Sequence, residues 1–155
     1  MGTEIERKFL LRDESWRAAA GNGERYVQGY LGSQPACSIR IRIAGERAWL
    51  NIKSATLGIE RAEYDYPIPV QDARDMVQRF CAPPLVEKTR YHVRVGAHVW
   101  EIDEFEGDNA GLVVAEIELG RVDEPFEAPA WLGAEVSHDP RYYNVSLARH
   151  PFKRW

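Results

Sequence analysis

Residues 4–10 carry two carboxylates and one ammonium group at alternate positions. In an extended strand successive side chains point to opposite faces, so Glu4, Glu6 and Lys8 would lie together on one face, with Ile5 on the other. Carboxylate oxygens suit a hard divalent cation, and a lysine point charge suits a phosphate group. The same spacing is also typical of a solvated strand face that carries a charge pair. The rest of the chain must decide between these two interpretations.

The alternation of charged and apolar residues returns along the chain and predicts further strands. After Cys37, for example, Ser38, Arg40 and Arg42 alternate with isoleucines, and the turn at Gly45 leads into a hairpin partner. Besides residues 4–10, we expect strands at residues 26–31, 37–43, 48–53, 60–68, 85–95, 99–105 and 112–119. Their charged faces hold the cations Lys8, Arg40, Arg42, Lys53, Arg61, Lys88 and Arg90 and the anions Glu4, Glu6, Glu63, Asp103, Glu116 and Glu118.

Helical segments are expected between and after the strands. Asp13 is a candidate cap for a short helix at residues 13–20, and apolar residues at helical spacing predict an amphipathic helix at residues 72–81. In the tail we expect short helices at residues 131–132 and 143–147, packed on the outside of the sheet.

The charged strand faces indicate a closed barrel rather than an open sheet. On an open sheet each exposed ion pair would stabilise the fold by only about 0–1 kcal/mol. In a barrel the charges line the lumen, and the amphipathic helix and the Trp-rich tail cover the apolar residues from outside. The residues that need this cover are Ile39, Ile41, Ile43, Trp49, Ile52, Tyr64, Tyr66, Trp100 and Ile102. We therefore predict a mainly β fold of the α+β type, a single eight-stranded antiparallel β-barrel that forms a charge-lined tunnel with a few helices outside.

Length and composition bound the class of protein. At 155 residues the chain suits a single domain spanning residues 1–155, and 45% hydrophobic with 28% charged residues is a globular composition. The net charge of -4 gives no basic footprint, so neither nucleic acid nor an anionic membrane is an expected partner. With 5 Trp and 7 Tyr, an aromatic-rich exterior is compatible with a homodimer.

The two cysteines, Cys37 and Cys81, are far apart and lack metal-ligand spacing, which indicates free thiols in a reducing compartment. No apolar run reaches the length of a signal-peptide core or a membrane span. We therefore expect a soluble, cytoplasmic protein.

The sequence Glu4-Ile5-Glu6-Arg7-Lys8 resembles the ExExK signature of the CYTH, or triphosphate tunnel metalloenzyme, superfamily. The later charged positions fall in the order in which that family places its tunnel residues, namely Arg40-Ile41-Arg42, Lys53, Arg61 with Glu63, Lys88 with Arg90, Asp103, and Glu116-Ile117-Glu118. The tail at residues 139–144 resembles the small bacterial members. The resemblance implies an eight-stranded antiparallel barrel that binds a linear triphosphate together with a divalent metal, Mg2+ or Mn2+.

The resemblance and the chemistry of the side chains together suggest candidate roles. Substrate phosphates would be bound by Lys8, Arg40, Arg42, Lys53, Arg61, Lys88 and Arg90. Metal ligands would come from Glu4, Glu6, Asp103, Glu116 and Glu118. Catalysis is assigned to Glu4, Glu6, Lys8, Lys53 and Glu63.

Within these sets the roles differ. Glu116 and Glu118 are expected as primary metal ligands, while Glu4 and Glu6 would bind metal or the attacking water. Lys8 would contact a terminal phosphate or the leaving group. We expect Glu63 to orient Arg61 or a neighbouring cation rather than to bind metal.

The predicted function is hydrolysis of a linear triphosphate, inorganic tripolyphosphate, to pyrophosphate and phosphate. Three alternatives share the tunnel: a class IV adenylyl cyclase, a thiamine or nucleoside triphosphatase, and a non-catalytic polyphosphate-binding module. The paired carboxylates argue against the last of these, because a pure anion-binding module has little use for them.

Some positions stay open at this point. Glu101 could face the tunnel or the solvent at its mouth, and Gln28 and Tyr30 could reach the lumen or the core. We expect His92 and Arg94 at the surface, at the end of their strand, and likewise His138 and His150 in the tail.

Overall fold

The structure is a computed structural model that describes residues 2–32 and 34–155. Within this part of the chain the strands are β1 (Gly2–Leu11), β2 (Glu24–Tyr30), β3 (Cys37–Ala44), β4 (Arg47–Ser54), β5 (Glu60–Ile68), β6 (Val86–Val95), β7 (His98–Phe105), β8 (Val113–Glu118) and β9 (Leu132–Glu135). The helices are α1 (Val70–Phe80) and α2 (Asn144–Arg149), with 3-10 turns η1 (Ser15–Ala19), η2 (Gly107–Asn109), η3 (Pro140–Tyr142) and η4 (Phe152–Arg154).

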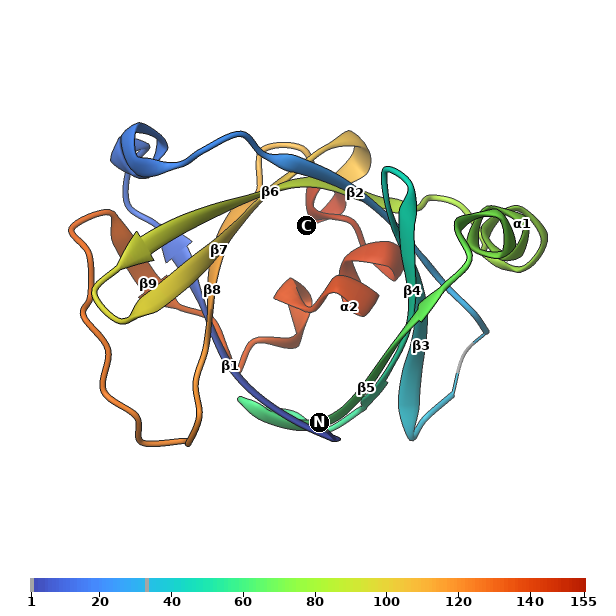
Figure 1. Ribbon diagram of the computed structural model, residues 1–155, viewed down its shortest axis with the longest axis horizontal. Coiled ribbons are helices and arrows are strands. Elements are labelled where there is room, and N and C mark those ends of the chain that lie inside the picture. The colour runs from blue at the N-terminus through green and yellow to red at the C-terminus, as the bar shows by residue number, and fades with distance from the viewer. Residues whose placement is uncertain (1, 33) are drawn as a thin grey trace.

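The strands form a closed antiparallel barrel. The hydrogen-bonded order is β5-β4-β3-β2-β6-β7-β8-β1, and β1 also pairs with β5, which closes the ring of eight strands seen end-on in Figure 1. Every pairing is antiparallel, and the hairpins turn at glycines such as Gly45, where φ is +60°. The predicted eight-stranded barrel is confirmed.

A ninth strand, β9, completes the edge of β1 that β5 leaves unpaired. β5 pairs with Gly2–Ile5, whereas β9 pairs with β1 at Phe9 and Leu11. Gly133 allows this approach, because a Cβ there would lie 2.8 Å from the Leu10 carbonyl oxygen. The helix expected at residues 131–132 is therefore wrong: Leu132 begins a strand.

The period of two along β3, β4 and β5 places most charged residues on the inner face and most apolar residues on the outer face. The inner rows across β3, β4 and β5 are Ser38–Lys53–Glu63 and Arg40–Asn51–Asp65, and the outer rows include Ile39–Ile52–Tyr64 and Ile41–Leu50–Tyr66. Trp49 follows the same period as Asn51 and stands opposite Arg42, so it belongs to the inner face. Its expected place on the outer face was wrong.

Two groups of residues cover the barrel from outside. α1 packs Ala73 on Ile41 and Ala48 of the β3–β4 hairpin. On the opposite side Trp131 packs edge-on against Trp100 of β7, with ring centroids 5.6 Å apart. The amphipathic helix and the Trp-rich tail therefore provide outer cover, as predicted.

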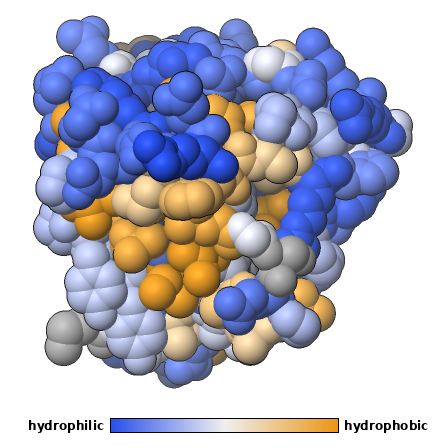
Figure 2. Space-filling view, turned by 90° about the vertical axis from the view of Figure 1, so that its right-hand side faces the viewer, coloured by the Kyte–Doolittle hydropathy of each residue, from blue (hydrophilic) through white to orange (hydrophobic). Residues whose placement is uncertain are grey.

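This outer cover is incomplete over β5. Tyr64 and Tyr66 remain 46% and 52% exposed, contrary to the expectation that the helix and the tail would cover them. Figure 2 shows an apolar area bordered by hydrophilic residues on the side of the barrel that carries α1, β3 and β4. α1 is only 11 residues long and lies against one end of these strands, near Ala48.

The tail segment around α2 lies across the barrel interior rather than outside it (Figure 1). Asn144 accepts hydrogen bonds from Gln28 of β2 and Lys88 of β6, both at 3.2 Å. The Lys8 ammonium donates to the Tyr142 carbonyl at 3.0 Å. These polar partners lie on the inner strand faces, so the segment turns into the lumen, and the expected outside position of the helix at residues 143–147 is corrected.

Where a helix was expected at residues 13–20 the chain forms the shorter 3-10 turn η1, whose N-cap residue is Glu14 and not Asp13; the Asp13 carboxylate accepts a hydrogen bond from the Ser15 backbone N–H at 2.9 Å. Among the described residues no helix has the length and apolar character needed to cross a membrane.

Candidate active site

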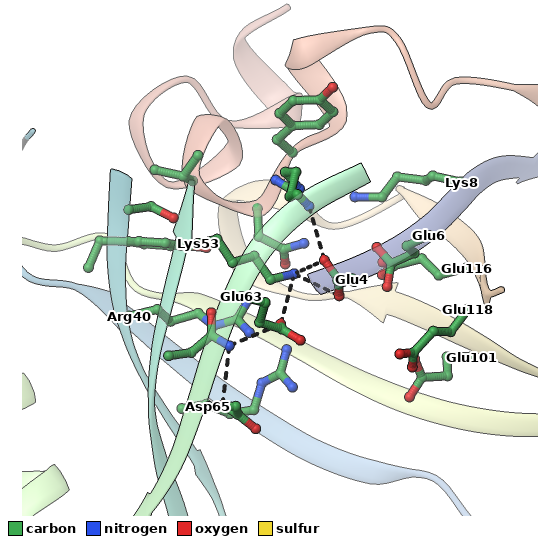
Figure 3. Close-up of a pocket in the computed structure, with 18 of the residues that line it drawn as sticks. Glu4, Glu6, Lys8, Arg40, Lys53, Glu63, Asp65, Glu101, Glu116 and Glu118 are labelled. Atoms are coloured by element: carbon green, nitrogen blue, oxygen red, sulfur yellow. Dashed lines mark hydrogen bonds and ion pairs between the residues drawn. The ribbon is translucent and has the colours of Figure 1, made fainter. Parts of the chain in front are cut away.

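The barrel encloses a cavity of about 180 Å³ whose lining is dominated by charged side chains. Its cations are Lys8, Arg40, Arg42, Lys53, Arg61 and Arg90, and its anions are Glu4, Glu6, Glu63, Asp65, Glu101, Glu116 and Glu118. Figure 3 shows that these groups come from several strands and converge on one space. Most of the residues proposed from the sequence therefore meet in one cavity.

Two of the proposed residues do not reach this cavity. Lys88 and Asp103 are fully buried, and the Lys88 ammonium lies 2.6 Å from the Asp103 carboxylate. Both oxygens of Asp103 also accept hydrogen bonds from the Arg90 guanidinium, at 2.7 and 2.9 Å. Asp103 thus lies behind the cavity wall with both oxygens engaged, and Lys88 lies beside it, so neither side chain faces the cavity as the sequence predicted.

One side of the cavity holds the guanidinium groups of Arg40, which is buried, and Arg42, which is half-buried. Arg40 is only 6% exposed, and its buried Nε has no hydrogen-bond partner. Within residues 2–32 and 34–155, neither Arg40 nor Arg42 forms an ion pair with a carboxylate. Burial, together with the charges of Arg40 and Arg90, lowers the pKa of Arg42 to about 10. Arg42 still carries its charge at neutral pH, so this wall has positive charge available for an anion.

The opposite side gathers carboxylates because of the strand register. Across β1, β8 and β7, Glu6 pairs with Glu118, Lys8 with Glu116, and Glu101 with Glu116. Glu101, left open by the sequence, therefore faces the cavity, where Figure 3 shows it beside Glu118.

These crowded carboxylates differ in the direction of their pKa shifts. Burial and the neighbouring Glu116 and Glu4 raise the pKa of Glu6 well above its usual value. For Glu116, burial acts to raise the pKa, but the charges of Lys8 and Arg90 outweigh it and hold the pKa well below the usual range. Burial and the charges of Glu4 and Glu101 raise the pKa of Glu118. This wall favours either a proton on Glu6 or an added cation.

Glu4 is a carboxylate of the acidic wall that contacts cations on neighbouring strands. Its carboxylate lies 3.0 Å from the Lys53 ammonium and 3.8 Å from the Arg61 guanidinium (Figure 3). Lys53 is also 3.5 Å from Glu63, so Glu63 faces this lysine. Burial acts to raise the pKa of Glu63, but Lys53 and a hydrogen bond from Asn51 lower it below its ordinary value.

The structure adds residues that the sequence did not single out. Asn51 donates to both Glu63 and Asp65, at 3.1 and 3.2 Å, and its inner-face position follows from the alternation in β4. Tyr143 and Asn144 also line the cavity, but the tail has no alternation that could have revealed them. The Tyr143 ring packs against Arg61, 5.2 Å from the guanidinium carbon to the ring centroid.

The positions left open or expected at the surface are also resolved. Tyr30 lines the cavity, and Gln28 is buried beside it in polar contact with Arg42. The residues expected at the surface are exposed, namely His92, Arg94, His138 and His150.

The acidic wall fits a divalent cation in its chemistry. Glu4, Glu6, Glu116 and Glu118 offer carboxylate oxygens, the ligands that Mg2+ and Mn2+ prefer, and the pKa of Glu6 is raised by burial and by the charges of Glu116 and Glu4 beside it. Among the described residues no three acidic, histidine or cysteine side chains already surround a single metal position. These side chains would therefore have to adjust around an ion.

The fold and the cavity define a closed antiparallel barrel with cationic and acidic walls facing each other across its lumen. A model of the CYTH domain matches residues 2–150 of this sequence. The chain belongs to the CYTH family, as its charged strand motifs indicated.

Two curated relatives cover nearly the whole chain. An inorganic triphosphatase of Acetivibrio thermocellus is 41% identical over 155 residues, which cover 100% of this chain and 99% of that protein. An inorganic triphosphatase of Nitrosomonas europaea is 36% identical over 155 residues, covering 94% of this chain and 97% of that protein. Among solved structures, the inorganic triphosphatase NE1496 matches with a TM-score of 0.65 at 31% identity, covering 93% of this chain and 96% of that one.

Proposed function

We propose that this chain is an enzyme that hydrolyses inorganic tripolyphosphate to pyrophosphate and phosphate with Mg2+ or Mn2+. The observation that carries the proposal is that Arg40, which is buried, and Arg42, which is half-buried, form no ion pair with a carboxylate among the described residues and face a carboxylate wall. A linear triphosphate has negative charge along its whole length, so it would bind the arginine wall directly and the carboxylate wall through a divalent cation. The triphosphatase relatives support this choice of substrate.

The cationic side chains have the role of binding the phosphates and stabilising charge as a phosphoryl group transfers. Arg40, Arg42, Arg61 and Arg90 would hold phosphate oxygens, with Lys53 beside Glu4. Lys8, held by the Tyr142 carbonyl, would contact the terminal phosphate or the leaving group.

The acidic side chains have the role of holding the divalent ion and the attacking water. Glu116 and Glu118 would be the main ligands of the divalent ion, with Glu4 and Glu6 binding the ion or the water. When bound, such an ion supplies positive charge that neutralises phosphate oxygens. Water attack forms one P–O bond while the bridging P–O bond to the leaving pyrophosphate breaks, and a carboxylate accepts the proton of the water. Glu63 would keep Lys53 in place.

A phosphate-release panel tests this proposal. Purified protein is given tripolyphosphate, ATP or thiamine triphosphate with Mg2+, Mn2+ or a chelator, and cyclic AMP is measured in parallel. We expect metal-dependent phosphate release that is fastest with tripolyphosphate. The double variant Glu116→Ala, Glu118→Ala should lose it, whereas the control Glu46→Ala, at an 85% exposed side chain in the β3–β4 turn, should not.

The other outcomes of the panel identify the alternatives. Cyclic AMP and pyrophosphate from ATP would make the protein an adenylyl cyclase, and faster turnover of an organic triphosphate would change the substrate. Binding of tripolyphosphate without turnover under any metal would leave a polyphosphate-binding module.

We further propose that the chain forms one domain over residues 1–155, resides in the cytoplasm and forms a homodimer. The free thiols of Cys37 and Cys81 support a reducing compartment. The exposed side chains Tyr64 and Tyr66 at the end of the outer rows are uncharged, so two copies could meet there without like-charge repulsion. Light scattering on the wild type and on Tyr64→Glu tests the dimer, which the variant should dissociate; a monomeric wild type would refute it.

A further inference from the structure

Arg42 is held in the cavity wall by an uncharged side chain. Its Nε donates to the Gln28 Oε1 at 2.7 Å, and the two residues stand directly opposite each other in the β2–β3 register. Gln28 is fully buried. A buried, neutral acceptor therefore anchors this guanidinium.

Other arginines of the chain are anchored differently. Arg7, Arg17 and Arg90 each direct two N–H groups to the two oxygens of one carboxylate. Such contacts are the strongest that arginine forms, but they also neutralise its charge. Because Arg42 has an amide in this place, its orientation is fixed while its positive charge remains for a ligand.

The orientation of the Gln28 amide depends on a second amide. Gln28 Nε2 donates to Asn144 Oδ1 at 3.2 Å, and the same oxygen accepts from the Lys88 ammonium at 3.2 Å. A guanidinium and an ammonium can only donate, so Gln28 must present its oxygen to Arg42 and Asn144 must present its oxygen to Lys88. Only one arrangement of the two amides satisfies all of these contacts.

The ring of Tyr26 fixes a further direction of the guanidinium. The carbon at the centre of the Arg42 guanidinium lies 4.7 Å from the Tyr26 ring centroid, and Tyr26 is 8% exposed. Since one N–H and one face of the group are engaged, its remaining N–H groups are left for the cavity that Arg42 lines.

We infer that Gln28 and Asn144 are positioning residues, which fix the Arg42 guanidinium toward the phosphate-binding cavity and leave its positive charge uncompensated. The inference rests on the proposed function only in taking the anion of this cavity to be a phosphate chain. It also gives the tail a role in substrate affinity, because Asn144 is the first residue of α2.

The test compares Gln28→Glu with Gln71→Glu, which makes the same change of charge at an exposed position of α1. The carboxylate introduced by Gln28→Glu can still accept the hydrogen bond from Arg42, but it neutralises the guanidinium. Calorimetry measures the Kd of tripolyphosphate with a chelator present, and steady-state kinetics measures KM and kcat with Mg2+. We expect Gln28→Glu to weaken binding and raise KM about tenfold with little change in kcat, and Gln71→Glu to leave all three values unchanged.

Asn144→Ala is the second variant, and it covers the case in which Gln28→Glu does not fold by circular dichroism. It removes the acceptor that orients Gln28 but adds no charge, so we expect Kd and KM to rise about threefold. Unchanged Kd and KM in whichever of these variants fold would overturn the inference.

The binding and turnover measurements separate this inference from the proposed function. If the wild type binds tripolyphosphate but releases no phosphate, hydrolysis is refuted and the Kd values still decide the role of Gln28. If both variants fold and turn over substrate like the wild type, the hydrolase stands and the positioning role is refuted. A wild type that binds no tripolyphosphate overturns both.

Discussion

The Lys88 ammonium and the Asp103 carboxylate form an ion pair 2.6 Å long between two side chains with no exposed surface. Asp103 also holds Arg90, which in turn reaches the cavity and lies 3.3 Å from Glu116. Arg90, which faces the cavity, is therefore held by Asp103, which does not face it and is itself paired with Lys88. A change in this buried pair should alter stability as well as the cavity.

Replacing Asp103 with asparagine should strongly destabilise the fold. The variant leaves Lys88 buried without its ion-pair partner, while Arg90 keeps Glu101 and Glu116, and breaking a buried pair in this way typically costs about 3–5 kcal/mol. Urea unfolding at pH 7 measures the change. The control Asp75→Asn removes a carboxylate that pairs with Arg79 on the surface of α1, and it should cost less than about 1 kcal/mol. Equal losses in the two variants would mean that the buried pair contributes no more than a surface pair.

Replacing Arg40 with methionine should raise the stability of the fold and weaken ligand binding. Arg40 is 6% exposed with an unpartnered Nε, so an apolar side chain of similar length removes a buried charge that forms no ion pair among the described residues. We expect the free energy of unfolding to rise by about 1–2 kcal/mol without ligand, while tripolyphosphate affinity falls at least about tenfold. Arg94→Met, at an exposed position on β6, is the matched control. Weaker binding together with lower stability would contradict this account.

The Arg7–Glu135 pair should make part of the stability dependent on pH. Two hydrogen bonds from Arg7 hold the pKa of Glu135 below its usual value, against the effect of burial. Because the folded state binds this proton less tightly than the unfolded chain, the stabilisation is complete above the unfolded pKa of about 4.3 and is lost as the pH falls through the folded pKa.

Glu135→Gln should therefore lower the free energy of unfolding by up to about 1 kcal/mol at pH 7 and make little difference once the pH lies below the folded pKa of Glu135. Urea unfolding of the variant and the wild type at several pH values measures the difference. Glu127→Gln, at an exposed position, serves as the control. A difference between variant and wild type that persists unchanged at low pH would rule out the pair as its source.

Truncating Trp131 to alanine should remove much of the outer cover. Trp131 is 7% exposed and packs edge-on against Trp100, so the loss should be about 3–5 kcal/mol by thermal or urea unfolding. Trp155→Ala, at a 39% exposed side chain, should have a smaller effect. If Trp131→Ala were no worse than Trp155→Ala, β9 and its neighbouring loop would not be part of the cooperative core.

The strands and most cavity residues could be predicted because a barrel strand repeats every two residues. Glu4, Glu6 and Lys8 show this directly, since one phase of the alternation carries all three into the lumen. The alternation reports only the face of the strand, however, and not the depth along the barrel axis. Lys88 and Arg90 share a face, yet Arg90 lines the cavity and Lys88 is sealed behind it against Asn144.

The tail residues that line the cavity could not be predicted from the alternation of a strand. Tyr143 and Asn144 reach the lumen through contacts with residues distant in the sequence, such as Lys88 and Gln28, 56 and 116 positions from Asn144, and no local pattern encodes such contacts. Trp49 was placed on the wrong face because its apolar character was given more weight than its position between Ala48 and Leu50 in the alternation. Where composition and period disagree in a strand, the period decides.

The division of one edge of β1 between two partners has a consequence for solubility at high concentration. β5 pairs with β1 through Ile5 and the Glu6 N–H donates to the Ile59 carbonyl, while β9 and the Val136 N–H take over from Lys8 onward. The Lys8 N–H at the junction is satisfied by the Ser137 hydroxyl. An extended segment of another chain thus finds no open hydrogen-bonding row on this edge, so strand addition, the usual first step of β aggregation, is blocked there.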